Sequence, residues 1–215
     1  MTGLDFRRTD KRLYEPGLTP SLVDVPTMRF ITVEGRGNPN TAPAYAGAIE
    51  TLYGLSYTIK MSRKGPVVPP GYVEYSVGPL EGLWWFEGGQ YTGTASVLER
   101  KDDFCWLAMI RQPEFVTPEV FEWACEAATK KKRNLDVTGA RLEDITEGLC
   151  AQVMHVGPYD DEPATVAALE AFIEASGHRG DMSGRRQHHE VYLTDPRRTA
   201  PDKLRTVIRH PVAPR

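Results

Sequence analysis

The chain carries one order of predicted elements twice: strand, helix, strand, strand. In the first half, a strand at 28–37 ends in a glycine turn, and apolar side chains in 41–61 recur at helical spacing. Extended segments follow at 72–86, interrupted at Gly78–Pro79, and at 103–113. A helix between strands has to bury its apolar stripe against their sheet, so we expect an α+β arrangement.

The second half repeats this order after a connecting helix. A strand at 148–157 leads through a glycine turn into a helix within 158–178, and strands follow at 187–195 and 203–212. Residue identity between the halves is weak. The order of the elements therefore carries the predicted repeat.

These repeats predict a duplicated βαββ domain with pseudo-twofold symmetry. Each sheet would bury one face under its helix, and the open faces would meet across a central groove, a common kind of ligand site. A chain of 215 residues is long enough for such a core. The predicted limits are an N-terminal arm at 1–26, a domain at 27–215, repeat one at about 27–113, a connecting helix at about 117–132 and repeat two at about 148–212.

The charge of the chain gives no indication of a nucleic-acid partner. The formal net charge is −3 at pH 7, whereas nucleic-acid-binding domains are typically basic. The short run TKKKR at 129–133 closes a helical pattern, where cations complement the helix dipole. Thr117 and Pro118 supply the N-cap and the first position of the same helix. We therefore expect no direct binding of nucleic acid.

The N-terminus and the cysteines indicate a cytoplasmic protein. The first residues, MTGLDFRRTDKRLYEP, are charged and lack the apolar region of a signal peptide. No apolar run approaches the ~20 residues that a membrane span needs. The three cysteines are an odd number without a Cys-x-x-Cys pair, which argues against a disulfide framework and against secretion. We expect no contact with a membrane.

The strand HHEVYLTDP at 188–196 has one apolar face and one reactive face. Alternation along a strand places Val191 and Leu193 on the first face, and Glu190 and Tyr192 on the second. A carboxylate in this position can hold a cationic ligand or take a proton from water, and the phenol can donate a hydrogen bond to a ligand oxygen. The alternative is a glutamate on a solvated strand face.

Aromatic side chains gather in segments on either side of this strand in the predicted fold. Flat aromatic faces suit flat aromatic ligands and delocalised cations. Trp84 and Trp85 are consecutive and point to opposite faces of a strand, so at most one lines a groove, and we favour Trp85. Packing in the core is the alternative for each ring. The further aromatic candidates are Trp106, Tyr72, Tyr75, Tyr91 and Tyr159.

The histidines and the known cofactor motifs predict neither a metal nor a cofactor. His155 ends a strand at a glycine turn, where a structural hydrogen-bonded role is favoured over ligand binding. His188 and His189 point apart and cannot form a compact metal site alone. The acidic run at 160–162 is explained by helix capping and the helix dipole. No phosphate loop, dinucleotide fingerprint or nucleophile elbow occurs.

Four motifs resemble those of the stand-alone GyrI-like small-molecule-binding proteins. The motifs are PLEGLWW at 79–85, MIRQPEFVTPEVF at 109–121, MHVGPYDDEPAT at 154–165 and HHEVYLTDPRRTAPDKLRTVIRHPV at 188–212. The last two are long and specific, and the resemblance extends from about residue 27 to the end of the chain. It implies a duplicated βαββ fold of two SHS2-type modules with a central ligand groove.

The resemblance also implies binding of flat, lipophilic and often cationic drugs. The family includes effector domains of multidrug-responsive transcription regulators. One stand-alone subfamily uses an aromatic cage to hydrolyse cyclopropane-bearing natural products that alkylate DNA. This chain has no N-terminal helix-turn-helix segment, so we expect a free-standing binder or enzyme.

The leading hypothesis from this resemblance is a hydrolase that opens electrophilic cyclopropanes with water and protects the cell. Glu190 would be the general base and Tyr192 would support the ligand carbonyl. Two competing hypotheses are a drug-sequestering or effector-sensing protein that acts with a protein partner, and an interaction module that blocks an enzyme such as gyrase. The residues expected to bind the ligand are Trp85, Trp84, Trp106, Tyr72, Tyr159 and His155.

Overall fold

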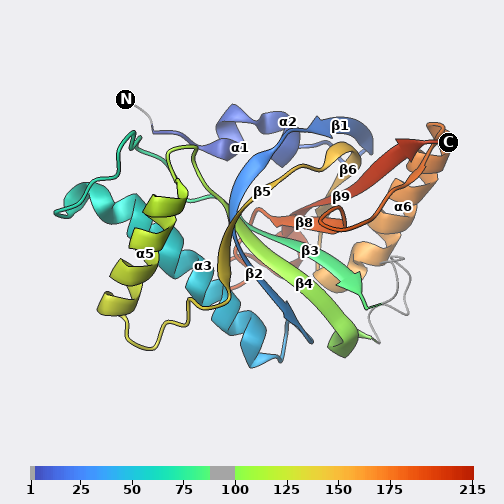
Figure 1. Ribbon diagram of the computed structural model, residues 1–215. Coiled ribbons are helices and arrows are strands. Elements are labelled where there is room, and N and C mark those ends of the chain that lie inside the picture. Colours follow the sequence, from blue (N-terminus) through green and yellow to red (C-terminus); the bar gives the residue numbers. More distant parts are fainter. Residues whose placement is uncertain (1–2, 88–99) are drawn as a thin grey trace.

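The computed structural model describes residues 3–87 and 100–215 and arranges them around one large antiparallel sheet (Figure 1). The strands follow the order β1–β6–β9–β8–β3–β4–β2–β5, and β7 pairs with β9. This mixed architecture is the α+β class that the sequence predicts. The strands are β1 Ser21–Val25, β2 Met28–Arg36, β3 Leu80–Phe86, β4 Phe104–Arg111, β5 Ala140–Ile145, β6 Gly148–Val156, β7 His178–Gly180, β8 His188–Tyr192 and β9 Arg205–Pro214. The helices are α1 Phe6–Thr9, α2 Lys11–Tyr14, α3 Pro43–Met61, α5 Pro118–Lys131 and α6 Glu162–Ala175, and a 3₁₀ turn at Tyr159–Asp161 precedes α6.

The two halves of the chain join through the pairing of β3 with β8. In this antiparallel pair Gly82 lies opposite Glu190, and Trp84 lies opposite His188. The expectation that the open faces of two sheets meet across a groove is therefore wrong. The inner strands pair edge to edge instead, because a ladder satisfies backbone groups that a free edge leaves unpaired. A site between the halves has to lie on one face of this continuous sheet.

α3 and α6 pack on the same face of the sheet. Leu52 of α3 and Leu169 of α6 belong to one apolar core, which also contains Trp84 and Trp106 from the sheet. Apolar side chains at helical spacing form this contact, and their burial is the main source of its stability. α5 packs against α3 (Figure 1).

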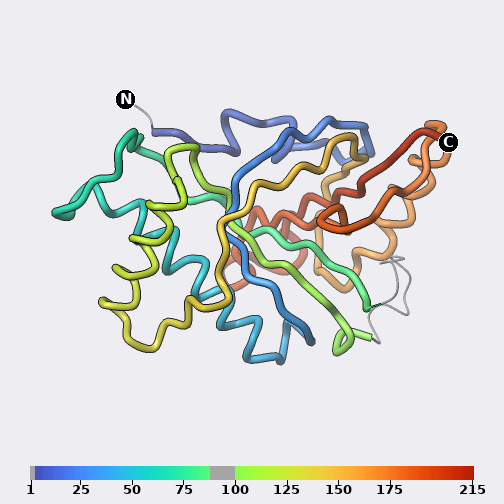
Figure 2. The backbone as a smooth tube through the Cα atoms, in the orientation of Figure 1, coloured from blue at the N-terminus to red at the C-terminus, as the bar shows by residue number. Residues whose placement is uncertain are grey.

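The N-terminal segment packs on the opposite face. Its short helices bring Phe6, Leu13 and Tyr14 into a second core with residues of β3 and β8, and β1 extends the sheet beside β6. The Tyr14 hydroxyl donates a hydrogen bond to Glu81 at 3.1 Å. In Figure 2 this segment runs along the upper side of the molecule, and the two chain ends lie on opposite sides of the view. The residues predicted as an arm at 1–26 are thus packed into the fold from Phe6 onward.

A network of charged side chains is buried beneath the N-terminal segment. His189 of β8 lies between two carboxylates, with Nδ1 2.9 Å from Glu147 and Nε2 3.0 Å from Glu81. Arg209 of β9 donates to Glu147 at 3.0 Å and to the Leu13 carbonyl at 2.8 Å. The four charged residues are each at most 3% exposed. Two acidic and two basic side chains therefore pair in a layer buried from water, where removing one partner would leave a buried charge unpaired and destabilise the fold.

The protonation of His189 predicts a loss of stability in alkali. Burial pulls its pKa down, but the charge and hydrogen bond of Glu147, with the hydrogen bond of Glu81, outweigh burial and raise the pKa from 6.5 to about 9. This stabilisation is full below pH 6.5, the ordinary value, and is lost as the pH rises through about 9. We expect the urea midpoint of unfolding to fall across that range. A midpoint that stays constant or rises would show that His189 is not a cation in the fold.

Most elements lie where the sequence predicts them, but α1, α2, β1 and β7 were not predicted, and two further segments differ. The Thr117 side chain caps α5 as expected, accepting from the Val120 amide. β5 was not predicted, because its polar sequence ARLEDI forms an edge strand that pairs with β2 alone. The stretch 72–79 forms no ladder, and only Tyr75 makes an isolated bridge, with Leu4. Within the described ranges, no helix combines the length and apolar character needed to cross a membrane.

Candidate active site

The face of β8 that carries Glu190 is turned toward α3 and α6. His188 and Glu190 are buried there, and Glu190 is 8% exposed. Val191 belongs to the core on the opposite face. The alternation read from the sequence therefore holds, and Glu190 is not a solvated strand-face residue. It lies among hydrogen-bonding and aromatic groups from both halves of the chain.

Tyr192 connects this carboxylate to the aromatic core. Its hydroxyl accepts a hydrogen bond from Trp84 Nε1 at 3.0 Å and lies within hydrogen-bonding reach of Glu190. Gly82 makes room for this arrangement, because a Cβ there would lie 2.8 Å from Trp84 Nε1. Burial first, and then the charge of Glu190, raise the pKa of Tyr192 well above its ordinary value. The phenol stays protonated and can donate to a ligand oxygen.

Two further tyrosines contact this group from outside the sheet. Tyr45 of α3 packs edge-on against Trp106, with ring centres 5.0 Å apart, and is tilted against Trp84 at 5.6 Å. Tyr159, in the turn before α6, packs edge-on against Tyr192 at 5.7 Å. Burial, followed by the charge of Glu190, raises the pKa of Tyr159 to about 12. The phenols around Glu190 are therefore neutral donors at physiological pH.

Glu162, the first residue of α6, lies beside Glu190 and is 3% exposed. Burial first, and then the charge and hydrogen bond of Glu190, raise its pKa well above the ordinary value. When two carboxyl groups share one buried site, the pKa of one of them rises so that it can hold a proton, and here that group is Glu162. In the sequence, Glu162 is explained by helix capping and the helix dipole, and no local motif marks it as a partner of Glu190.

His188 also contacts the Glu190 carboxylate, and it links that carboxylate to His210. Its Nε2 lies 3.0 Å from Glu190 Oε1, and its Nδ1 lies 2.6 Å from His210 Nε2. Burial lowers the pKa of His188 to about 4 despite its contact with the carboxylate, so the ring is neutral. Ligating atoms of Glu162, His188 and Glu190 all lie within 4.8 Å of one another. We refer to Glu162, His188 and Glu190 as the acid–base cluster, within which a hydrogen bond joins His188 to Glu190.

Trp85 does not lie on the face of Glu190. It packs on the opposite face, against the second core, whereas Trp84 lies opposite His188 and so shares the face of Glu190. Adjacent strand residues point to opposite faces, so only one of the two could reach Glu190, and the residue on its face is Trp84 rather than the favoured Trp85. Trp106 shares the face of Trp84, and its Nε1 has no hydrogen-bond partner among the described residues.

Tyr72 and His155 have contacts of their own. The Tyr72 hydroxyl donates to the Lys60 carbonyl at 2.8 Å, and its ring packs against Phe115 away from Glu190. His155 Nδ1 lies 2.8 Å from Thr165 Oγ1, and Nε2 lies 3.0 Å from the Pro158 carbonyl. Both ring nitrogens thus tie the end of β6 to the start of α6, which fits the structural interpretation. Among the other aromatic candidates, Tyr91 lies outside the described residues.

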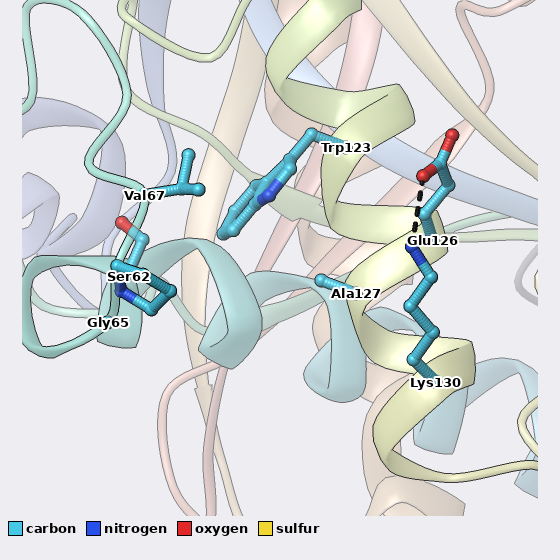
Figure 3. Close-up of a pocket in the computed structure, with 8 residues that line it drawn as sticks. Ser62, Gly65, Val67, Trp123, Glu126, Ala127 and Lys130 are labelled. Atoms are coloured by element: carbon cyan, nitrogen blue, oxygen red, sulfur yellow. Dashed lines mark hydrogen bonds and ion pairs between the residues drawn. The ribbon is translucent and has the colours of Figure 1, made fainter.

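Two surface hollows lie apart from this cluster. Figure 3 shows one of about 260 Å³ between α5 and the turn after α3, where Trp123 faces Val67 and Lys130 pairs with Glu126. The second lies on the opposite face of the sheet from Glu190 and includes Trp85. Neither contains a residue of the acid–base cluster.

Comparisons with known proteins place these observations in a family context. A model described as the GyrI-like small molecule binding domain matches residues 18–213. An uncharacterized conserved protein from Listeria innocua is 43% identical, with a TM-score of 0.91 over 98% of this chain and 100% of the other. Two hydrolase structures from Listeria innocua are 42% and 40% identical, with TM-scores of 0.90 and 0.88 over 99% and 98% of this chain and 100% of each. No curated protein matches the chain.

Proposed function

The chain belongs to the family of GyrI-like small-molecule-binding domains, and from this membership we propose that it hydrolyses electrophilic cyclopropanes carried by flat, DNA-alkylating compounds and so protects the cell. One observation carries the proposal: Glu190, a buried carboxylate, lies beside protonated Glu162 and among aromatic rings from both halves. Two hydrolases that are 40% and 42% identical over nearly the whole chain support a hydrolytic activity.

The reaction needs one base and one hydrogen-bond donor. Glu190 takes a proton from a water molecule while the water oxygen bonds to a cyclopropane carbon. The ring C–C bond breaks, and its electron pair moves through the conjugated ligand to the carbonyl oxygen. Tyr192 or Glu162 donates a hydrogen bond to that oxygen as it gains negative charge. The proton that Glu190 took from water then passes, through Glu162 or solvent, to that oxygen, which regenerates the carboxylate and completes the addition of one water molecule.

The aromatic side chains would hold the ligand during this step. Trp84, Tyr45 and Tyr159 come from the sheet, from α3 and from the turn before α6, so they approach Glu190 from three elements. Stacking on flat rings orients a planar ligand, and fixed orientation lowers the barrier further. No step draws on a cofactor, because the conjugated ligand itself accepts the electron pair.

We also infer the duplicated βαββ module and its pseudo-twofold symmetry from the strand order. Each half has three strands: one before the helix and two after it. The strand before the helix pairs with the last strand, and the last strand pairs with the middle one. The resulting orders are β2–β4–β3 in the first half and β6–β9–β8 in the second. The two middle strands meet at the centre. Glu190 and Gly82 are cross-strand partners where these strands pair, which supports a ligand site at the junction of the halves.

The alternative is a drug-sequestering or effector-sensing protein, which the description of the family as small-molecule-binding favours. A multiple-turnover assay separates the two functions. The protein is mixed with an excess of a spirocyclopropane substrate, with and without a chelator, and the ring-opened product is followed by chromatography. Product beyond one equivalent per chain, in both conditions, is expected of the hydrolase. A stoichiometric change in ligand fluorescence without product would instead identify a binder.

A further inference from the structure

The acid–base cluster continues from Glu190 toward the surface through two buried histidines. His188 Nε2 lies 3.0 Å from Glu190 Oε1, and His188 Nδ1 lies 2.6 Å from His210 Nε2. His210 Nδ1 lies 2.5 Å from Glu170 Oε1. Both imidazoles are 0% exposed, whereas the Glu170 side chain is 44% exposed. Three hydrogen bonds therefore join the buried carboxylate to one that faces solvent.

The donor and acceptor rules for imidazole and carboxylate limit where the protons of these hydrogen bonds can lie. An imidazole nitrogen donates only when it carries a proton, and a carboxylate only accepts. When Glu190 is ionised, neutral His188 donates its single ring proton from Nε2, so its Nδ1 accepts from His210 Nε2. His210 Nδ1 faces the carboxylate of Glu170 and has to donate as well. His210 is then a cation.

With His188 neutral and the Glu170 carboxylate ionised, the same three protons have one other complete arrangement. In it Glu190 is protonated and donates to His188 Nε2, His188 donates from Nδ1 to His210 Nε2, and neutral His210 donates from Nδ1 to Glu170. The arrangements differ by two shifts: one proton moves from Glu190 to His188 Nε2, and another moves from His188 Nδ1 to His210 Nε2. No proton enters or leaves, and Glu190 is a base only when the proton is on His210.

We propose that His188, His210 and Glu170 form a positioning relay, which keeps Glu190 ionised by holding its proton on His210 beside the Glu170 carboxylate. This role rests on the proposed hydrolysis, in which Glu190 is the base. The hydrogen bond from His210 also lowers the pKa of Glu170, so the outer end of the relay stays negative. In the described part of the chain, the other titratable groups that face Glu190 are Glu162, Tyr192, Tyr45 and Tyr159.

Nitrogen-15 NMR of histidine-labelled protein tests the relay without any substrate. At pH 7 the wild type should show His210 protonated on both nitrogens and His188 protonated on Nε2 alone. Glu170→Gln keeps the side-chain length but removes the charge that stabilises the cation, so His210 should become neutral. The control Glu174→Gln, further along α6 and paired with Arg215, should leave both histidines unchanged. A neutral His210 in the wild type, or a cation that survives Glu170→Gln, would overturn the relay.

The kinetic consequence separates a positioning role from a merely structural one. In Glu170→Gln the proton returns to Glu190, so the pH profile of turnover should move about one unit toward alkaline pH. At pH 7, kcat should be lowered about tenfold, and KM should stay within about twofold of the wild-type value. Glu174→Gln should match the wild type. An unmoved profile overturns the relay. If the wild type turns over no substrate, the proposed hydrolysis fails, and the histidine spectra still decide the relay.

Discussion

Replacing Glu190 by glutamine is expected to lower turnover by about 10²–10⁴-fold, the usual contribution of a general base. The change keeps the shape of the side chain and its acceptor toward His188 Nε2, which lies 3.0 Å from the carboxylate oxygen. It removes the basic oxygen that takes the proton from water. Binding of neutral ligands should change little, because the aromatic rings remain in place. Rates and dissociation constants measured on the same preparations would show a fall in kcat with affinity preserved.

A matched control and two contrary outcomes make this test decisive. Glu174→Gln changes an exposed glutamate on α6 and should leave both rate and affinity unaltered. Turnover that survives Glu190→Gln would remove the residue from the mechanism. If instead only cationic ligands bind more weakly and no product forms in the wild type, Glu190 is a counter-ion, and the small-molecule-binding alternative is correct.

The largest effect on stability is expected from Arg209→Met. Arg209 is 1% exposed and donates to Glu147, Gln152 and the Leu13 carbonyl. Methionine fills much of the same volume but leaves Glu147 with one cation fewer in a dry layer. Removing one partner of a buried ion pair typically costs about 3–5 kcal/mol. The free energy of unfolding, measured by urea titration, should fall by about that amount.

The same strand provides a control for this substitution. Arg205 is exposed at the start of β9, so Arg205→Met should change the free energy of unfolding by no more than about 0.5 kcal/mol. Adding Glu147→Gln to Arg209→Met should cost less than the sum of the two single changes, because the unpaired charge is then removed. Additive losses, or a single loss below about 1 kcal/mol for Arg209→Met, would show that the network contributes little.

The sequence predicts the elements and the face of the key strand well, because both depend on local periodicity. The helices at 41–61 and 117–132 and the strand containing Glu190 follow from the spacing of apolar side chains. The same alternation separates Glu190 from Val191, since neighbouring strand residues always point apart. Local rules also explain why Trp84 and Trp85 cannot both reach the site. They do not say which of the two does, because that depends on pairing between distant strands.

The partners of Glu190 could not be predicted, because they depend on tertiary contacts. Glu162 approaches it from a separate helix, and its raised pKa comes from burial, which no spacing in the sequence records. His210 lies 22 residues from His188 and reaches it through strand pairing. The edge-to-edge joining of the halves was missed for the same reason. If each half had been predicted to end in a strand with an unpaired edge, the pairing of those two edges would have been expected.

The packing of Leu13 and Tyr14 sets a practical limit on shortening the chain. The family match begins at residue 18. Trimming the chain to that point would remove the Leu13 carbonyl, which accepts from Arg209, and the Tyr14 hydroxyl, which donates to Glu81. Orphaned polar groups inside a protein are costly, so a recombinant version cut there is expected to precipitate or be degraded. Expression trials should keep the residues that precede the recognised family boundary.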